Sequence, residues 1–206
     1  MNRHPSRHAN KSFYHDKATS TLMTIVITLP TFFHGEAEHI VQFLHGGRVN
    51  LIHIRKPGAT VDEVENLILN IPVTLRHRLV IHDHFQLAQQ YALHGIHLNS
   101  RNPSPPDGWQ GSISRSCHSI EELIMWKERC NYLSLSPIFD SISKRGYRSA
   151  FTPDIISSAH NKGIIDKKVL ALGGVTFDNI TTVIRMGFGG AMILGDAWKE
   201  KPSTHV

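Results

Sequence analysis

Eight short apolar runs, separated by helix-like segments, constrain the fold of this 206-residue chain more than any other feature. They are rich in Val, Ile and Leu and mostly lack strict alternation, which is typical of strands buried on both faces of a parallel sheet. The runs are Thr24–Leu29, Asn50–Ile54, Arg78–Ile81, Gly95–Leu98, Ser112–Ser116, Tyr132–Leu135, Lys168–Ala171 and Gly190–Leu194. Helical patterns lie between them, at 36–45, 61–70, 85–93, 119–129, 153–161 and 176–186. This alternation predicts a compact (β/α)₈ barrel, as a single domain over residues 23–206.

The competing arrangement for such a chain is an open, doubly wound sheet. That fold favours a glycine-rich loop after its first strand, whereas residues 29–33 read Leu-Pro-Thr-Phe-Phe. Helix-capping side chains stand where three helices are expected to start, at Thr60, Ser119 and Thr152. We therefore expect the barrel, whose ligands bind beyond the carboxyl ends of its strands.

Charge is distributed unevenly between the start of the chain and the rest. Residues 1–22 are polar and aperiodic, so we expect either a disordered leader or an over-extended start, with translation beginning at Met23. Four of the 22 basic residues and one of the 17 acidic residues lie there, which leaves 18 against 16 for the barrel. With basic and acidic residues so evenly balanced, we expect the barrel to lack the clustered basic face of a nucleic-acid binder.

The lengths of the apolar runs and the number of cysteines also narrow the cellular location that we expect for this protein. The longest apolar run, residues 22–29, falls far short of the roughly 20 residues that span a bilayer. Cys117 and Cys130 are too few for a disulfide framework, and the chain has no Cys-x-x-Cys motif. We expect a cytoplasmic protein with a small-molecule ligand, no membrane and no nucleic acid; a homo-oligomer stays open.

Histidines gather where the predicted strands end. Of the 15 histidines, five lie at or just beyond the ends of the second to fifth strands: His53, His82, His84, His97 and His118. Alternation places His53 and Arg55 on one side of the second strand, and an inward-facing pair of this kind indicates a ligand. His118 stands at the junction of the fifth strand and its helix, where a general acid/base could meet a substrate.

Further polar residues follow the other strands. Asp83 can bind a metal or orient a histidine, and Ser116 lies on the same side of its strand as His118. Lys144, in the long connection after the sixth strand, is a natural anion contact. Glycines after the seventh and eighth strands allow close approach of a phosphate to the backbone. The residues expected to bind the phosphate are Gly173, Gly174, Leu194 and Gly195.

These segments, in this order and spacing, resemble the thiamine phosphate synthase/TenI family of thiamine-biosynthesis barrels. The resemblance covers the chain from Met23 and rests on residues 52–55, 95–98, 114–122, 136–144 and 171–175. One branch of the family couples a pyrimidine pyrophosphate to thiazole phosphate with Mg²⁺. The other, the TenI branch, shifts a proton to aromatise carboxythiazole phosphate.

The chain departs from the synthase branch at two places. The synthase motif Gln-x-Arg-x-Lys falls on His53, Arg55 and Pro57, and Lys56 lies one residue early, where it should face away. The second acidic metal ligand of the synthase, 19 residues beyond Asp83, falls on Asn102. Losing one carboxylate and one lysine weakens Mg²⁺ and pyrophosphate binding.

The TenI branch is the closer match, because it carries a similar Ile-His-Ile-Arg and Arg-Ser-x-His-Ser. The resemblance makes His118 the catalytic acid/base of a thiazole tautomerase that needs no cofactor. The expected substrate-binding residues are His53, Arg55, His82, Asp83, Ser116 and Lys144.

Three alternatives stay open. One is a working synthase that uses Mg²⁺ at Asp83, with His53, Lys56 and His82 replacing the lost groups. Another is a non-catalytic regulator that binds thiazole phosphate or thiamine phosphate. The last is that the five strand-end histidines surround a transition metal, since imidazole suits Zn, Cu, Ni or Fe.

Overall fold

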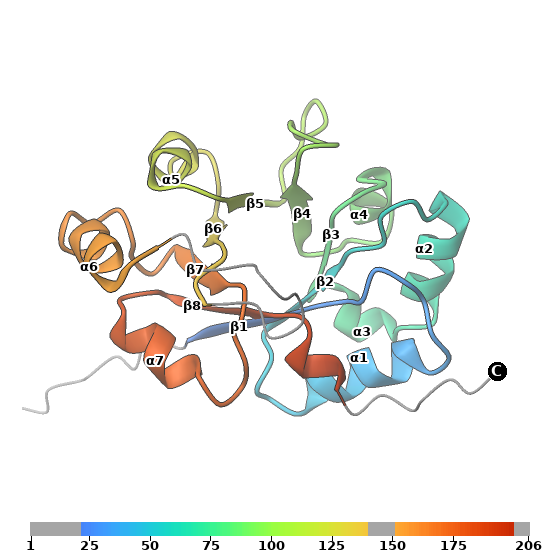
Figure 1. The fold of residues 1–206 in the computed structure, drawn as a ribbon. Helices are drawn as coiled ribbons and strands as arrows, with labels where there is room; N and C mark the ends of the chain where they lie inside the picture. The colour runs from blue at the N-terminus through green and yellow to red at the C-terminus, as the bar shows by residue number, and fades with distance from the viewer. Residues whose placement is uncertain (1–21, 140–150, 200–206) are drawn as a thin grey trace, which may run out of the picture.

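The eight predicted strands form one closed parallel barrel in the computed structural model, which describes residues 22–139 and 151–199 (Figure 1). The strands are β1 (Met23–Ile27), β2 (Leu51–Ile54), β3 (Leu79–Ile81), β4 (Gly95–Leu98), β5 (Ser112–Cys117), β6 (Tyr132–Leu135), β7 (Val169–Leu172) and β8 (Gly190–Ile193). Each strand pairs with the next, and β1 pairs with β8, with Ile25 opposite Met192. The (β/α)₈ prediction is therefore confirmed.

Helices surround the strands on the outside of the barrel (Figure 1). They are α1 (Glu36–His45), α2 (Val61–Leu69), α3 (Val73–Arg76), α4 (Gln86–Gln90), α5 (Ile120–Trp126), α6 (Pro153–Asn161) and α7 (Ile180–Arg185), followed by the 3₁₀ helix η1 (Asp196–Trp198). The three expected caps form: the side-chain oxygens of Thr60, Ser119 and Thr152 each accept a backbone N–H of their helix. None of the described helices is long and apolar enough to cross a membrane.

The structure differs from the sequence prediction at a few elements. The helices α4, α5 and α7 are shorter than their apolar patterns, and α3 was not predicted. Its four residues, opened by Pro72, are too few to show helical periodicity. The described residues between β4 and β5 form no helix. Of the expected leader, residues 1–22, only Leu22 lies within the described part of the chain.

Two apolar layers hold the barrel together. Side chains such as Ile52 and Ile54 point outward and pack beneath the helices. A smaller cluster fills part of the barrel interior and contains Ile25, Ile27, Leu51, Val80, Tyr132, Leu170 and Met192. The helix-facing layer accounts for most of the buried apolar area, the main source of stability.

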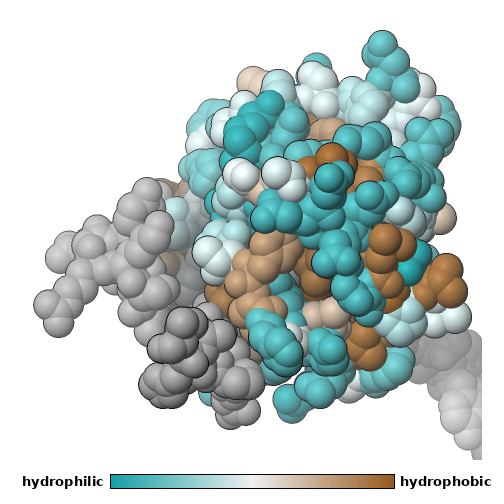
Figure 2. Space-filling model, turned by 90° about the vertical axis from the view of Figure 1, so that its right-hand side faces the viewer, coloured by the Kyte–Doolittle hydropathy of each residue, from teal (hydrophilic) through white to brown (hydrophobic). Residues whose placement is uncertain are grey.

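The surface follows the usual polar pattern. The face shown in Figure 2 is mainly hydrophilic, and its hydrophobic side chains lie in separate patches. Large exposed hydrophobic residues among those described include Val73, Ile124 and Met125. Scattered exposure of this kind is normal. The polar residues that are buried are more informative, and most lie inside the barrel.

Candidate functional site

A pocket of about 420 Å³ opens at the carboxyl ends of the strands, where a barrel of this type binds its ligands. We call it the mouth pocket. Its lining is Ile27, Arg55, His82, His97, Asn99, Ser100, Arg101, Arg115, Ser116, His118, Glu122, Ser136, Leu172 and Leu194. Six of the predicted site residues therefore meet there: Arg55, His82, Ser116, His118 and Leu194 line it, and His53 lies against His82.

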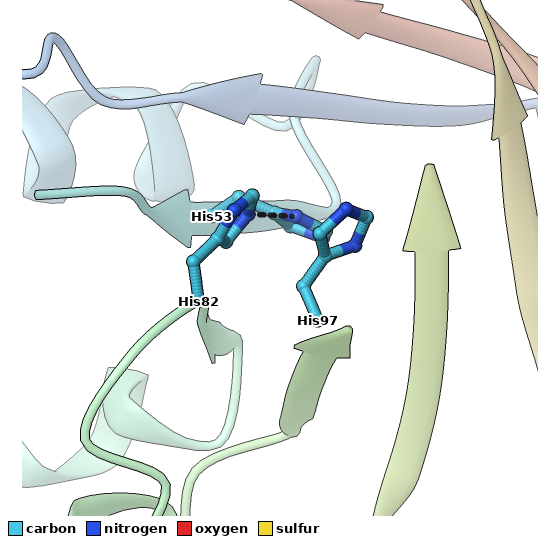
Figure 3. A group of neighbouring side chains, drawn as sticks. All are labelled: His53, His82 and His97. Atoms are coloured by element: carbon cyan, nitrogen blue, oxygen red, sulfur yellow. Dashed lines mark hydrogen bonds between the residues drawn. The ribbon is translucent and has the colours of Figure 1, made fainter. Parts of the chain in front are cut away.

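Three histidines from consecutive strands meet at the inner end of the mouth pocket (Figure 3). His53 is on β2, His82 directly follows β3 and His97 is on β4. The Nδ1 of His53 lies 3.0 Å from the Nε2 of His82, and the rings of His82 and His97 stack with centroids 4.2 Å apart. All three are buried.

Hydroxyl groups of β5 and β6 complete the hydrogen bonds of these rings. The hydroxyl of Tyr132 lies 2.7 Å from His53 Nε2. His97 contacts the hydroxyl of Ser114 through Nδ1, at 2.9 Å, and that of Ser116 through Nε2, at 3.0 Å. Ser134 donates in turn to Ser116. The barrel interior thus contains a polar network beside its apolar cluster, and Tyr132 belongs to both.

Burial makes all three rings poor bases. Desolvation lowers the pKa of His53 and of His82 well below the ordinary value, and the neighbouring His97 adds to the effect in both. Desolvation, with repulsion from Arg115 and Arg55, lowers the pKa of His97 to about 3. The three imidazoles are therefore neutral at pH 7.

His118 is an exposed residue at the β5–α5 junction, held by the start of the helix. Ser119 caps α5, and the carboxylate of Glu122 accepts the backbone N–H of His118 at 2.7 Å. The Nδ1 of His118 lies 3.2 Å from both the carbonyl and the hydroxyl oxygens of Ser136. These contacts orient the ring through Nδ1, as a general acid/base that works through Nε2 requires.

Three arginines line the mouth pocket, and Glu122 is the only carboxylate among its lining residues. Arg115 stacks on Trp126, with its guanidinium carbon 4.2 Å from the ring centroid. Its buried Nε and Nη1 have no hydrogen-bond partner among the described residues. An unpaired buried donor is costly, and the stacking on Trp126 offsets part of that cost.

Asp83, the predicted metal ligand, is engaged by protein groups. Arg101 binds it through Nε at 3.1 Å and Nη2 at 2.9 Å, and the side-chain amide of Asn102 donates to it at 2.8 Å. Mg²⁺ prefers several free oxygen ligands. One carboxylate already bound by a guanidinium does not fit the magnesium site of the synthase branch.

Lys56 faces away from the mouth pocket, as its position in the sequence suggested. Its ammonium group donates to both carboxylate oxygens of Glu36, at 2.6 and 2.7 Å, and to the carbonyl of Thr31. Both side chains of this ion pair are almost fully buried. The idea that Lys56 replaces the lost lysine of the synthase is therefore wrong, because the tight turn after β2 sends it toward α1.

The glycines after β7 and β8 lie in two adjacent loops. Gly173 and Gly174 have φ angles of 90° and 64°, which glycine adopts without strain. A Cβ on Gly173 would lie 2.8 Å from the backbone of Pro137. The backbone N–H of Phe177 donates to Asp196, which ties the β7 loop to the segment that follows Gly195. The phosphate role of these residues stays a prediction.

The structure does not bring His84 into this site. His84 turns away, with Nε2 2.8 Å from the carbonyl of Ala59, so the five strand-end histidines do not surround one point. Lys144 lies outside the described residues.

The sequence prediction did not include four residues of this site: Tyr132, Ser136, Arg101 and Arg115. Period-two alternation on β6, which aligns Tyr132, Ser134 and Ser136, would have found two of them.

A closed (β/α)₈ barrel with an arginine-lined pocket at the carboxyl ends of its strands defines a class of protein that binds small anionic ligands. The model of the thiamine monophosphate synthase family (TMP-TENI) matches residues 24–195, and the chain belongs to this family. A solved structure of thiamine phosphate pyrophosphorylase from Bacteroides thetaiotaomicron is 38% identical, covers 90% of this chain and 89% of that one, and superposes with a TM-score of 0.81.

Curated relatives are more distant. The thiamine-phosphate synthase of Koribacter versatilis is 25% identical over 166 residues, or 77% of this chain and 78% of that protein. The thiamine-phosphate synthase of Salinibacter ruber is 27% identical over 124 residues, and there the match spans about half of each protein, 56% and 53%. These relatives do not separate the TenI branch from the synthase branch, and their names favour the coupling reaction over tautomerisation.

Proposed function

We propose that this chain acts on thiazole phosphate at the mouth pocket, and that its reaction is the coupling of thiazole phosphate to a pyrimidine pyrophosphate. The observation that carries the proposal is the set of three arginines around one pocket, Arg55, Arg101 and Arg115. Two phosphorylated substrates bring several negative charges to this place, and guanidinium groups bind phosphate oxygens in pairs. The names of the relatives support the same reaction.

Two of these arginines, Arg115 and Arg101, lie in different surroundings. Arg115 lines the pocket, and its guanidinium stacks on Trp126 with Nε and Nη1 buried. Arg101 lies where the family holds its metal and carries a permanent positive charge next to Asp83. Negative charge grows on the pyrophosphate as it leaves, and a preorganised cation stabilises that charge. Because Asp83 is already bound, we derive no step that depends on Mg²⁺ held by the protein.

A second candidate is tautomerisation of carboxythiazole phosphate, which one observation favours. His118 stands in the pocket with Nδ1 held by Ser136. In this reaction one proton leaves the ring of the substrate and another returns at a different atom, and a single imidazole can carry out both transfers. This reaction needs neither a metal nor a pyrophosphate, so the ion pair between Asp83 and Arg101 does not hinder it.

The test is to assay one purified sample for both reactions. With hydroxymethylpyrimidine pyrophosphate, thiazole phosphate and free Mg²⁺ supplied, we expect thiamine phosphate to form in proportion to enzyme. If no thiamine phosphate forms at high enzyme concentration but carboxythiazole phosphate is aromatised, the second candidate replaces the first.

A further inference from the structure

The histidines His53, His82 and His97 form a group whose chemistry neither candidate reaction uses. One ring nitrogen from each can be chosen so that all three lie within 4.8 Å of one another. The rings come from three consecutive barrel strands and converge on one point (Figure 3). We propose that these three imidazoles bind a transition-metal ion of the Zn²⁺ class at the inner end of the mouth pocket.

The distances are close to those of a three-histidine site. Zinc lies about 2.0–2.1 Å from imidazole nitrogen, so tetrahedral ligand atoms are about 3.4 Å apart. The nitrogens of His53 and His82 that face each other are 3.0 Å apart. They need to separate by only a few tenths of an ångström. The stacked rings of His82 and His97 must turn so that one nitrogen of each points at the ion.

The groups around the rings are those that support metal-bound histidines. Such histidines keep their second ring nitrogen hydrogen-bonded, which fixes the tautomer and the orientation. Tyr132 holds Nε2 of His53 and leaves Nδ1 for the metal. Ser114 and Ser116 hold opposite nitrogens of His97, so one serine contact persists whichever nitrogen binds.

The ligand set selects the metal. Three neutral imidazoles suit Zn²⁺, Co²⁺, Ni²⁺ or Cu²⁺, whereas Mg²⁺ needs oxygen ligands. His82 and His97 line the mouth pocket, so the fourth position faces it. Water, hydroxide or an oxygen of the bound anion would occupy that position, as in open three-histidine zinc sites.

The experiment uses the full chain, with any affinity tag removed and metals stripped by a chelator. Zn²⁺ is titrated in competition with a chromogenic chelator, and Co²⁺ is titrated separately for its visible spectrum. We expect one tight equivalent of Zn²⁺ and a tetrahedral Co²⁺ spectrum. His82→Gln and His97→Gln should lose that equivalent, and the exposed control His45→Gln should keep it.

Two further measurements guard against misfolded variants. Tyr132→Phe keeps the volume of the side chain but removes the hydrogen bond to His53, and should weaken Zn²⁺ binding about 10–100-fold. X-ray absorption of the zinc-loaded wild-type protein should show three imidazole ligands and no sulfur. The proposal is overturned if the wild-type protein takes up no stoichiometric Zn²⁺, or if the absorption spectrum lacks three imidazoles. It is also overturned if the folded His97→Gln variant binds Zn²⁺ with unchanged affinity. These outcomes do not depend on which reaction the enzyme performs.

Discussion

Arg101 binds Asp83 in a two-point ion pair, with Nη2 and Oδ2 2.9 Å apart, at the place where the family resemblance puts a metal. The arginine is about half exposed, whereas most of the carboxylate is covered. In the proposed coupling reaction, this guanidinium is the group that would contact the pyrophosphate.

Removing that charge should weaken binding of the pyrophosphate substrate. A hydrogen bond to a charged group contributes about 1.5–3 kcal/mol, so Arg101→Met should raise the KM for the pyrimidine pyrophosphate about 10–150-fold. Steady-state assays of thiamine phosphate formation measure this KM. Arg48→Met, an exposed arginine that precedes β2, is the control and should leave KM unchanged. Equal KM values for Arg101→Met and the wild type would show that Arg101 does not contact this substrate.

His118→Gln tests the acid/base role in tautomerisation. Loss of a general acid/base lowers the rate about 10²–10⁴-fold, and we expect this loss in single-turnover aromatisation of carboxythiazole phosphate. Ser136→Ala should cost far less, because the Ser136 carbonyl stays 3.2 Å from His118 Nδ1. If the rate of His118→Gln stayed within a fewfold of the wild-type rate, His118 would not be the general acid/base of this reaction.

Lys56 should matter for stability. Removing one partner of a buried ion pair costs about 3–5 kcal/mol, since it leaves an uncompensated charge. Lys56→Met, which leaves Glu36 buried, should lower the free energy of unfolding in urea by that amount. The comparison is Lys199→Met, which breaks the pair between the exposed Lys199 and Asp196 and should cost under about 1 kcal/mol. Similar losses of unfolding free energy in the two variants would contradict a stabilising role for the buried ion pair between Lys56 and Glu36.

The three buried histidines should make the metal-free protein sensitive to acid. As pH falls below about 6.5, the ordinary histidine pKa, the unfolded chain binds protons at these positions that the folded chain does not, so the free energy of unfolding falls as pH falls. Each histidine contributes a slope of about 1.4 kcal/mol per pH unit. Urea unfolding at pH 7, 6, 5 and 4, with a chelator present, measures the slope.

His97→Gln removes one of these groups and should make that dependence shallower by about one histidine. The same series on His45→Gln controls for the substitution itself. Identical pH profiles for the wild type and His97→Gln would mean that His97 is not held neutral by burial.

The barrel could be predicted from the sequence because most of its strands carry an apolar signal of their own, although β5 reads Ser-Ile-Ser-Arg-Ser-Cys. Alternation also placed His53 and Arg55 on one inward line, and the order of the strands brought His82 and His97 beside His53. Other contacts depend on loop conformation, which periodicity does not encode. His84 turns to Ala59 because its φ angle is 57°. Arg101 lies in the irregular segment after β4, where sequence alone does not distinguish a solvated arginine from one bound to Asp83.

The most direct test of the central claim is the formation of thiamine phosphate by purified protein. Hydroxymethylpyrimidine pyrophosphate and thiazole phosphate are supplied at saturating concentrations with Mg²⁺, and product is followed by chromatography. The rate of the wild type is compared with that of an Arg115→Met variant. We predict product formation by the wild type that scales with enzyme, and a rate reduced at least tenfold in the variant that lacks one of the three arginines of the mouth pocket. Absence of thiamine phosphate at high enzyme concentration would contradict it.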